Sequence, residues 1–172
     1  MQHRDRLVGF TVFKDGVRKM GIADITLPDI EYMTESLKGS GVGGEVDLVN
    51  PGNISAMSAT FNWRTLNDDL VVLSQPITHK LECRGAIEQY DAGTGEYETK
   101  SAALIMNVTP KKVSLGKLEN NATMDANNEF SVVYLKLKLD DVTVLEIDPL
   151  NYIFNVGGTD FLAKVRSALG LV

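Results

Sequence analysis

The two residues best suited to nucleophilic chemistry, His79 and Cys83, lie on one predicted strand. A histidine that hydrogen-bonds to a thiol can activate it, and the same pair can bind a metal. Four positions along a strand, however, separate two side chains by roughly 13 Å, which is too far for a hydrogen bond. The pattern therefore favours a buried histidine and a buried thiol. Cys83 is the single cysteine, so the sequence also excludes an intrachain disulfide and a multi-cysteine zinc site.

A glycine-rich run at residues 38–44, KGSGVGG, is a second candidate, because glycine loops can cradle phosphate groups. A phosphate-binding loop ends in Lys followed by Ser or Thr, and it joins a strand to a helix. This run has neither feature. It is more typical of a flexible hairpin tip.

Two carboxylates, Glu146 and Asp148, alternate onto one face of a predicted strand, opposite its apolar face. Such a pair can serve as acid and base, but it is more often a solvated face or, in an assembly, a charged lining. Asp140-Asp141 could hold a cation, although a solvated hairpin turn is the usual role of such a pair. We therefore predict no enzyme, no cofactor and no metal site.

The elements that must position these residues are mostly short strands with alternating polarity, separated by Gly, Asn and Asp. This pattern is typical of an antiparallel β protein. We predict strands at 8–13, 20–27, 54–63, 78–90, 97–108, 130–139, 142–147 and 152–156, with a hairpin turn at Asp15-Gly16 after the first of them. The middle of one strand, 102–106, is apolar on both faces and is predicted to be buried on both, whereas 115–128 is predicted to be a loop.

Two helices are predicted. The first covers 67–73, with Asn67 as its cap. The second follows a Thr159 cap and ends at Gly170. Its apolar stripe at helical spacing comprises Phe161, Leu162, Val165, Ala168 and Leu169. The expected fold is an antiparallel β sandwich or barrel with one packed C-terminal helix, in a single domain spanning residues 1–172.

Residues 30–49 are predicted to form a long hairpin arm that has little apolar surface to bury on its own domain. A strand pair without support finds partners on another chain. We therefore predict that the arm makes contacts between subunits or between rings of subunits. The residues assigned to this contact are Tyr32, Thr34, Lys38, Gly39, Ser40, Gly41, Val42, Gly43 and Gly44.

Composition limits the partners. The 172 residues are 44% hydrophobic and carry a formal net charge of −6, so a core is expected and tight wrapping of nucleic acid is disfavoured. No apolar run approaches the roughly 18 residues that a membrane span needs. Residues 1–6 lack the apolar core of a signal peptide, which predicts release in the cytoplasm.

Three parts of the sequence, in the right order, resemble the major tail tube protein of contractile-tailed phages and of R-type phage-tail-like bacteriocins. The segments are GFTVFKDG at 9–16; ITLPDI at 25–30, TE at 34–35 and KGSGVGGEVD at 38–47; and EIDPLN at 146–151, FNVGGTD at 154–160 and ALGL at 168–171. The turn at 156–160 departs from the Asn-Gly-Val-Asp turn that the family often has, and residues 110–128 show no match.

The resemblance implies homo-hexameric rings that stack into a hollow tube inside a contractile sheath, with neighbouring strands completing an inner β barrel. It implies a tape-measure protein in the lumen, baseplate and tail-terminator proteins at the ends, and no stable membrane anchor. The tube would be made in the bacterial host cytoplasm and reside in the virion tail or bacteriocin particle. On contraction it would cross the target envelope and conduct DNA in a phage or ions in a bacteriocin. Glu146 or Asp148 would line the lumen.

Alternatives remain open at this point. One is the tube protein of a type VI or extracellular contractile injection system, which shares the architecture and differs in its partners. A second is a monomeric β-sandwich binding module with an exposed aromatic platform, for which Phe61 and Trp63 are the candidates. A third is an enzyme.

Overall fold

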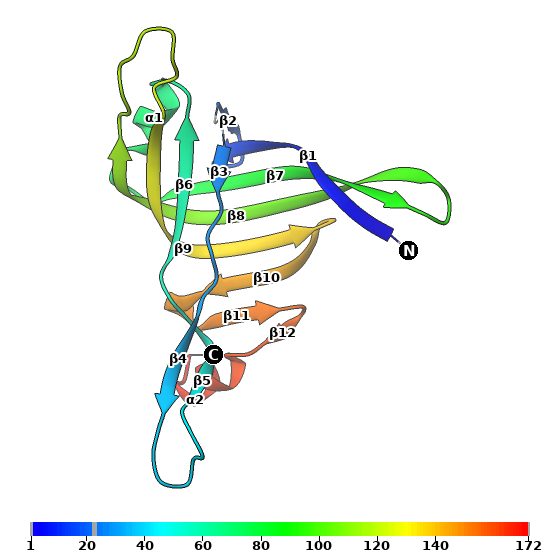
Figure 1. The fold of residues 1–172 in the computed structure, drawn as a ribbon, viewed down its shortest axis with the longest axis vertical. Helices are drawn as coiled ribbons and strands as arrows, with labels where there is room; N and C mark the ends of the chain where they lie inside the picture. The colour runs from blue at the N-terminus through cyan, green and yellow to red at the C-terminus, as the bar shows by residue number, and fades with distance from the viewer. Residues whose placement is uncertain (1, 22–23, 172) are drawn as a thin grey trace.

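A computed structural model describes residues 2–21 and 24–171, without the side chains of residues 2–5. Within these ranges ten strands form one antiparallel sheet, and two further strands form a separate hairpin (Figure 1). The prediction of a mainly antiparallel β fold is confirmed.

Four long strands make up the middle of the sheet. They are β1 (Gln2–Lys14), β7 (His79–Asp91), β8 (Glu96–Ser114) and β9 (Ala126–Leu139). The sheet continues from β9 through β10 (Val142–Asp148), β11 (Ile153–Val156) and β12 (Thr159–Asp160), and from β1 to β2 (Arg18–Met20).

Strand β9 has two different partners along the same edge. Its first half, Ala126 to Val132, pairs with β6 (Met57–Trp63), and its second half, Leu135 to Leu139, pairs with β10. Strand β3 (Asp24–Thr26) adds to β6. Figure 1 shows β9 bending between the two halves. The β8–β9 register shifts at Asn107/Val108 and again at Pro110/Lys112, and such bulges bend a sheet.

Tight turns set the register of two hairpins, as the sequence predicts. Asp15 (φ 54°) and Gly16 (φ 73°) connect β1 to β2, and Asp140 (φ 50°) and Asp141 (φ 62°) connect β9 to β10. Two successive residues with positive φ are what a type I′ hairpin turn requires, and Asp and Gly adopt this conformation at low cost.

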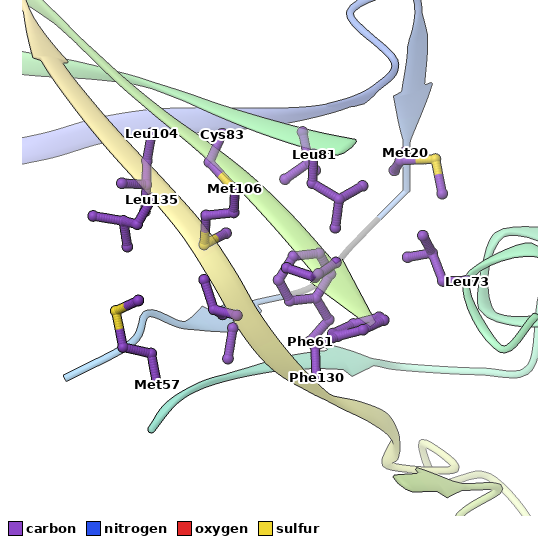
Figure 2. Packing of buried hydrophobic residues seen from close by; sticks show 14 of the residues in the cluster. Met20, Met57, Phe61, Leu73, Leu81, Cys83, Leu104, Met106, Phe130 and Leu135 are labelled. Atoms are coloured by element: carbon purple, nitrogen blue, oxygen red, sulfur yellow. The ribbon is translucent and has the colours of Figure 1, made fainter. Parts of the chain in front are cut away.

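The core lies between the long strands and the layer formed by β6 and α1 (Asp68–Leu73). Every second residue of β6, from Met57 to Trp63, is buried, as its alternation predicts. Figure 2 shows Phe61 beside Phe130, whose ring centroid lies 5.1 Å away in a T-shaped arrangement. The indole Nε1 of Trp63 donates to Asn128 Oδ1 at 2.8 Å, which satisfies both buried polar groups.

Helix α1 begins where the sequence predicts. The side chain of Asn67 accepts a hydrogen bond from the backbone N–H of Leu70 at 2.9 Å, which is the geometry of an N-cap. Leu70 and Leu73 point into the core and are buried.

Several strand boundaries differ from the prediction. The strand predicted at 20–27 is two strands, β2 and β3, which pair with different partners, and residues 22–23 lie outside the described residues. Strand β8 continues past its predicted end to Ser114, because the bulge at Pro110 lets pairing resume. Leu104 and Met106 are buried, whereas Ala103 and Ile105 on the opposite face are only half-buried, so the prediction that both faces of 102–106 are buried is wrong.

The prediction that Thr159 caps the last helix is also wrong. Thr159 lies in β12, and α2 (Ala163–Ala168) begins four residues later. The carboxylate of Asp160 instead accepts from the backbone N–H of Leu162 at 3.1 Å and pairs with Arg166 Nη1 at 2.6 Å. Gly170 has φ 72° and ends the helix as predicted.

The predicted apolar stripe of this helix is only partly used. Leu162, which directly precedes α2, is buried, but Phe161, Val165, Ala168 and Leu169 remain exposed, and no residue of α2 itself is buried.

Candidate functional site: the assembly surfaces

His79 and Cys83 lie on the same buried face of β7, with Leu81 between them, as predicted. The Nε2 atom of His79 lies 3.0 Å from the backbone oxygen of Gln75, whereas Nδ1 has no hydrogen-bond partner among the described residues. Burial lowers the pKa of His79. Burial, aided by the nearby charge of Glu82, raises the pKa of the Cys83 thiol to about 12. A neutral imidazole and a neutral thiol in a core are structural groups.

The described residues contain no cluster of three or more metal-ligating side chains. In the same part of the chain, no helix has both the length and the apolar character that crossing a membrane requires. The aromatic platform that a binding module would need is absent at its predicted position, because Phe61 and Trp63 are buried.

The glycine-rich run forms the tip of a projecting hairpin arm, as predicted. Its strands are β4 (Tyr32–Leu37) and β5 (Val46–Ile54), which pair only with each other among the described strands (Figure 1). Gly39 (φ 142°) and Gly41 (φ 100°) adopt backbone conformations that residues with a side chain rarely adopt. Glu45 closes the tip through hydrogen bonds from Ser36 and Lys38, which lower its pKa.

The arm has one apolar face. Leu37 pairs with Val46, and Glu35 with Leu48, so these side chains share one face with Met33. The side chains of Thr34, Ser36 and Asp47 point to the other face. All four apolar residues, Met33, Leu37, Val46 and Leu48, are between 46% and 51% exposed. A two-stranded ribbon is marginally stable unless such a face packs against something.

The root of the arm is anchored to the C-terminal end of the sheet. The Tyr32 ring lies 5.9 Å from the Phe154 ring, which in turn lies 6.3 Å from that of Phe161. Gly52 (φ 84°) packs against the side chain of Leu162 so closely that an added Cβ would lie 2.7 Å from it. The root is therefore fixed, whereas the rest of the arm projects away from the body.

The two predicted lumen carboxylates have different surroundings. Glu146 is half-buried and accepts a hydrogen bond from the Tyr134 hydroxyl at 2.9 Å. Burial and this bond raise the pKa of Tyr134 to about 12. Asp148 is buried and caps the 3-10 helix η1 (Pro149–Asn151) by accepting from the backbone N–H of Asn151 at 3.3 Å, and it also accepts from Asn151 Nδ2 at 2.6 Å. The two side chains make separate local contacts rather than an acid–base pair.

Glu146 belongs to the polar face of the sheet, which carries charges of both signs. Across the strands Glu146 pairs with Lys136, Lys136 with Ile105, and Ile105 with Glu82. Arg84, two residues along β7, bonds Glu82 at 2.8 Å and lies over the Phe13 ring. The surplus of negative charge on the chain is therefore not concentrated on this face.

One side of the sheet ends in an unpaired strand edge. Among the described strands, only β7 pairs with residues 2–11 of β1, because β2 reaches no further than Val12. Figure 1 shows β1, β7 and β8 extending together beyond β9 as a three-stranded ribbon. An unpaired edge of this length is a template for pairing with another chain.

An apolar groove of about 310 Å³ lies where the sheet extends beyond the layer that covers the core. Residues from four long strands form its floor, and Ile25 and Leu27, before the arm, form one wall. Sequence reasoning missed the groove and the free edge, because both depend on which distant strands pair.

A family model described as phage tail tube protein FII matches residues 4–170. The chain belongs to this family. It is 28% identical to the major tail tube protein of Serratia phage KSP20 over 167 residues, covering 94% of each chain. It is 26% identical to the tail tube protein of Escherichia phage P2, covering 93% of this chain and 94% of that one.

The fold is also similar to a chain in a cryo-EM structure of the PVC sheath/tube terminator of an extracellular contractile injection system. The TM-score is 0.56 at 13% identity, over 79% of this chain and 97% of that one. The protein is thus a structural subunit of a phage-type tail tube, and the resemblance seen in its sequence is confirmed. Its place is in the tail of a virion or a related particle.

Proposed function

We propose that this tail tube protein, as a single domain spanning residues 1–172, forms hexameric rings that stack into the inner tube of a contractile tail. One observation carries the proposal: within the described residues, the chain leaves both a long strand edge and a hairpin arm without partners. A closed ring removes sheet edges. The ring number of six rests on the resemblance.

Within a ring, the free edge of β1 hydrogen-bonds to the sheet of the neighbouring copy, so that the sheets join into one barrel. The polar face of the sheet, with Lys136 and Glu146, lines the lumen, and Asp148 holds the strand end beside it. Mixed charges on that wall suit passage of DNA without tight binding, because neither sign dominates. The arm, including its tip at 38–44, contacts copies in the same or the adjacent ring.

The remaining partners of this proposal rest on the resemblance. The sheath surrounds the tube, a tape-measure protein occupies the lumen during assembly, and baseplate and terminator proteins bind its two ends. The subunit is made in the host cytoplasm and has no catalytic activity of its own. Contraction drives the tube through the target envelope, after which the lumen conducts DNA in a phage or ions in a bacteriocin.

Negative-stain electron microscopy of the concentrated protein, with size-exclusion chromatography, tests this function. Hollow rods or stacked rings are expected. A variant lacking residues 39–44 should remain a folded monomer by circular dichroism and form no tubes, because the arm loses its tip. Normal tubes from this deletion would contradict the role of the arm, and a wild-type protein that stays monomeric even with its baseplate would contradict tube formation.

A further inference from the structure

Two of the uncovered apolar surfaces on the described part of the chain differ in shape. The arm presents a narrow, mostly apolar ridge, formed by Met33, Leu37, Val46 and Leu48 with the charged Glu35 among them. The groove beside β3 is a concave surface with the exposed side chains of Leu7, Phe10 and Leu27 at its rim. Neither surface is covered by another part of the chain that the structure describes.

The chemistry of the groove fits apolar side chains. Apart from Asp24 and Arg84, its lining residues are apolar or glycine. Ligand pockets for small molecules combine apolar walls with several convergent polar groups, and this groove has few. Gly85 has no side chain to fill the groove. A Cβ at that position would lie only 2.9 Å from Leu7 Cδ1.

The arm cannot turn back into the groove of its own chain. The contacts of Tyr32 with Phe154, and of Gly52 with Leu162, fix its root at the C-terminal end of the sheet. From there the arm projects away from β1, β7 and β8, which carry most of the groove floor (Figure 1). The occupant must come from another molecule, and in a tube the nearest molecules are copies of this chain.

We infer that the apolar face of the arm packs into the β1–β7–β8 groove of an adjacent copy. This inference rests on the proposed tube function and adds the surface that receives the arm. The contact joins two different patches of the same protein, so it is heterologous and repeats from copy to copy, either around a closed ring or along an open stack. Such a contact links many copies, whereas a self-complementary patch would stop at a dimer.

Cysteine crosslinking tests the inference, because Cys83 is the single native cysteine. In a Cys83→Ser parent, Leu7→Cys at the rim of the groove is combined with Leu48→Cys on the apolar face of the arm. Tubes oxidised by air with copper-phenanthroline should give a ladder of disulfide-linked oligomers on a non-reducing gel. The matched control replaces Leu48→Cys by Val49→Cys, which is similarly exposed on the opposite face of the arm.

The outcomes distinguish the contact between arm and groove from the proposed tube function. A ladder that needs both Leu7→Cys and Leu48→Cys, and is at least several-fold weaker with Val49→Cys, supports the inference. Tubes that form normally but give no ladder, or an equal ladder from both arm positions, overturn it while leaving the proposed function intact. A wild-type protein that forms no tubes, even with the baseplate, contradicts the proposed function and this inference with it.

Discussion

The body and the arm of this subunit are both built from antiparallel pairs, but they bury their side chains very differently. In the body, β6 and β9 place Phe61 and Phe130 fully inside, between two layers. In the arm, all six residues of β4 are exposed, although half of them are apolar. The core of the body is therefore complete within one chain, whereas the arm has the composition of a surface that is covered only after assembly. Substitutions should affect stability in the first region and assembly in the second.

The largest loss of stability is expected in the body. Phe61→Ala removes a fully buried ring and leaves a cavity, so the free energy of unfolding should fall by about 3–5 kcal/mol. Urea denaturation of the unassembled protein, followed by circular dichroism, measures it. Leu118→Ala is the control, because Leu118 is 89% exposed and its loss should change little. A loss below about 1 kcal/mol for Phe61→Ala would mean that the core is less tightly packed than described.

The cap of α1 should have a smaller effect. Asn67→Ala removes the side-chain acceptor for the N–H of Leu70, which should cost about 1 kcal/mol in the same experiment. Asn67→Asp keeps an acceptor and should stay close to wild type. If both variants lose equally, the contact of Asn67 with the chain around Gly21 would matter more than the cap.

These two sites also show what the sequence could and could not predict. The alternation of β6, the Asn67 cap and the Asp15-Gly16 turn are local patterns, and each predicted its structure correctly. The division of β9 between two partners depends on pairing between residues more than 60 positions apart, such as Ala59 with Phe130. A single-chain pattern holds no signal for such pairing, so the groove and the free β1 edge were missed.

The prediction that Thr159 caps the last helix was wrong for a related reason. Thr159 followed by an apolar stripe has the local pattern of a capped helix. Thr159 instead pairs with Val156 and belongs to β12. The side chain of Asp160 accepts a hydrogen bond from the backbone N–H of Leu162, just before the helix. Tertiary pairing overrode a weak local preference. The contact residues predicted for the arm stay a prediction, because contacts between copies are not visible in one chain.

A pH effect on stability is expected in the body. Because burial lowers the pKa of His79, the unfolded chain binds a proton more readily than the folded one. Stability is therefore full above the unfolded pKa of about 6.5 and is lost as the pH falls below it. Thermal unfolding measured from about pH 7.5 to 5.5, above the range of ordinary carboxylates, should show the decline. His79→Gln should flatten it and His3→Gln should not, whereas a decline unchanged by His79→Gln would assign it elsewhere.

The smallest effect on stability and the sharpest effect on assembly are expected in the arm. Leu48→Asp changes a side chain that is 49% exposed, so the free energy of unfolding of the monomer should shift by no more than about 0.5 kcal/mol. Tubes should nevertheless be lost, because a second carboxylate, next to Glu35 on the opposite strand, would have to leave water to enter an apolar groove.

Val49→Asp makes the same kind of change at a position that is 54% exposed on the opposite face of the arm, and it should still assemble. Electron microscopy and sedimentation of both variants, beside their urea curves, give the comparison. If both variants assemble, the apolar face of the arm is not a contact. If both fail, the whole arm is enclosed in the tube, and the difference between its two faces has no role. If only Leu48→Asp fails to form tubes, and its monomer is as stable as wild type, the apolar face of the arm is required for assembly.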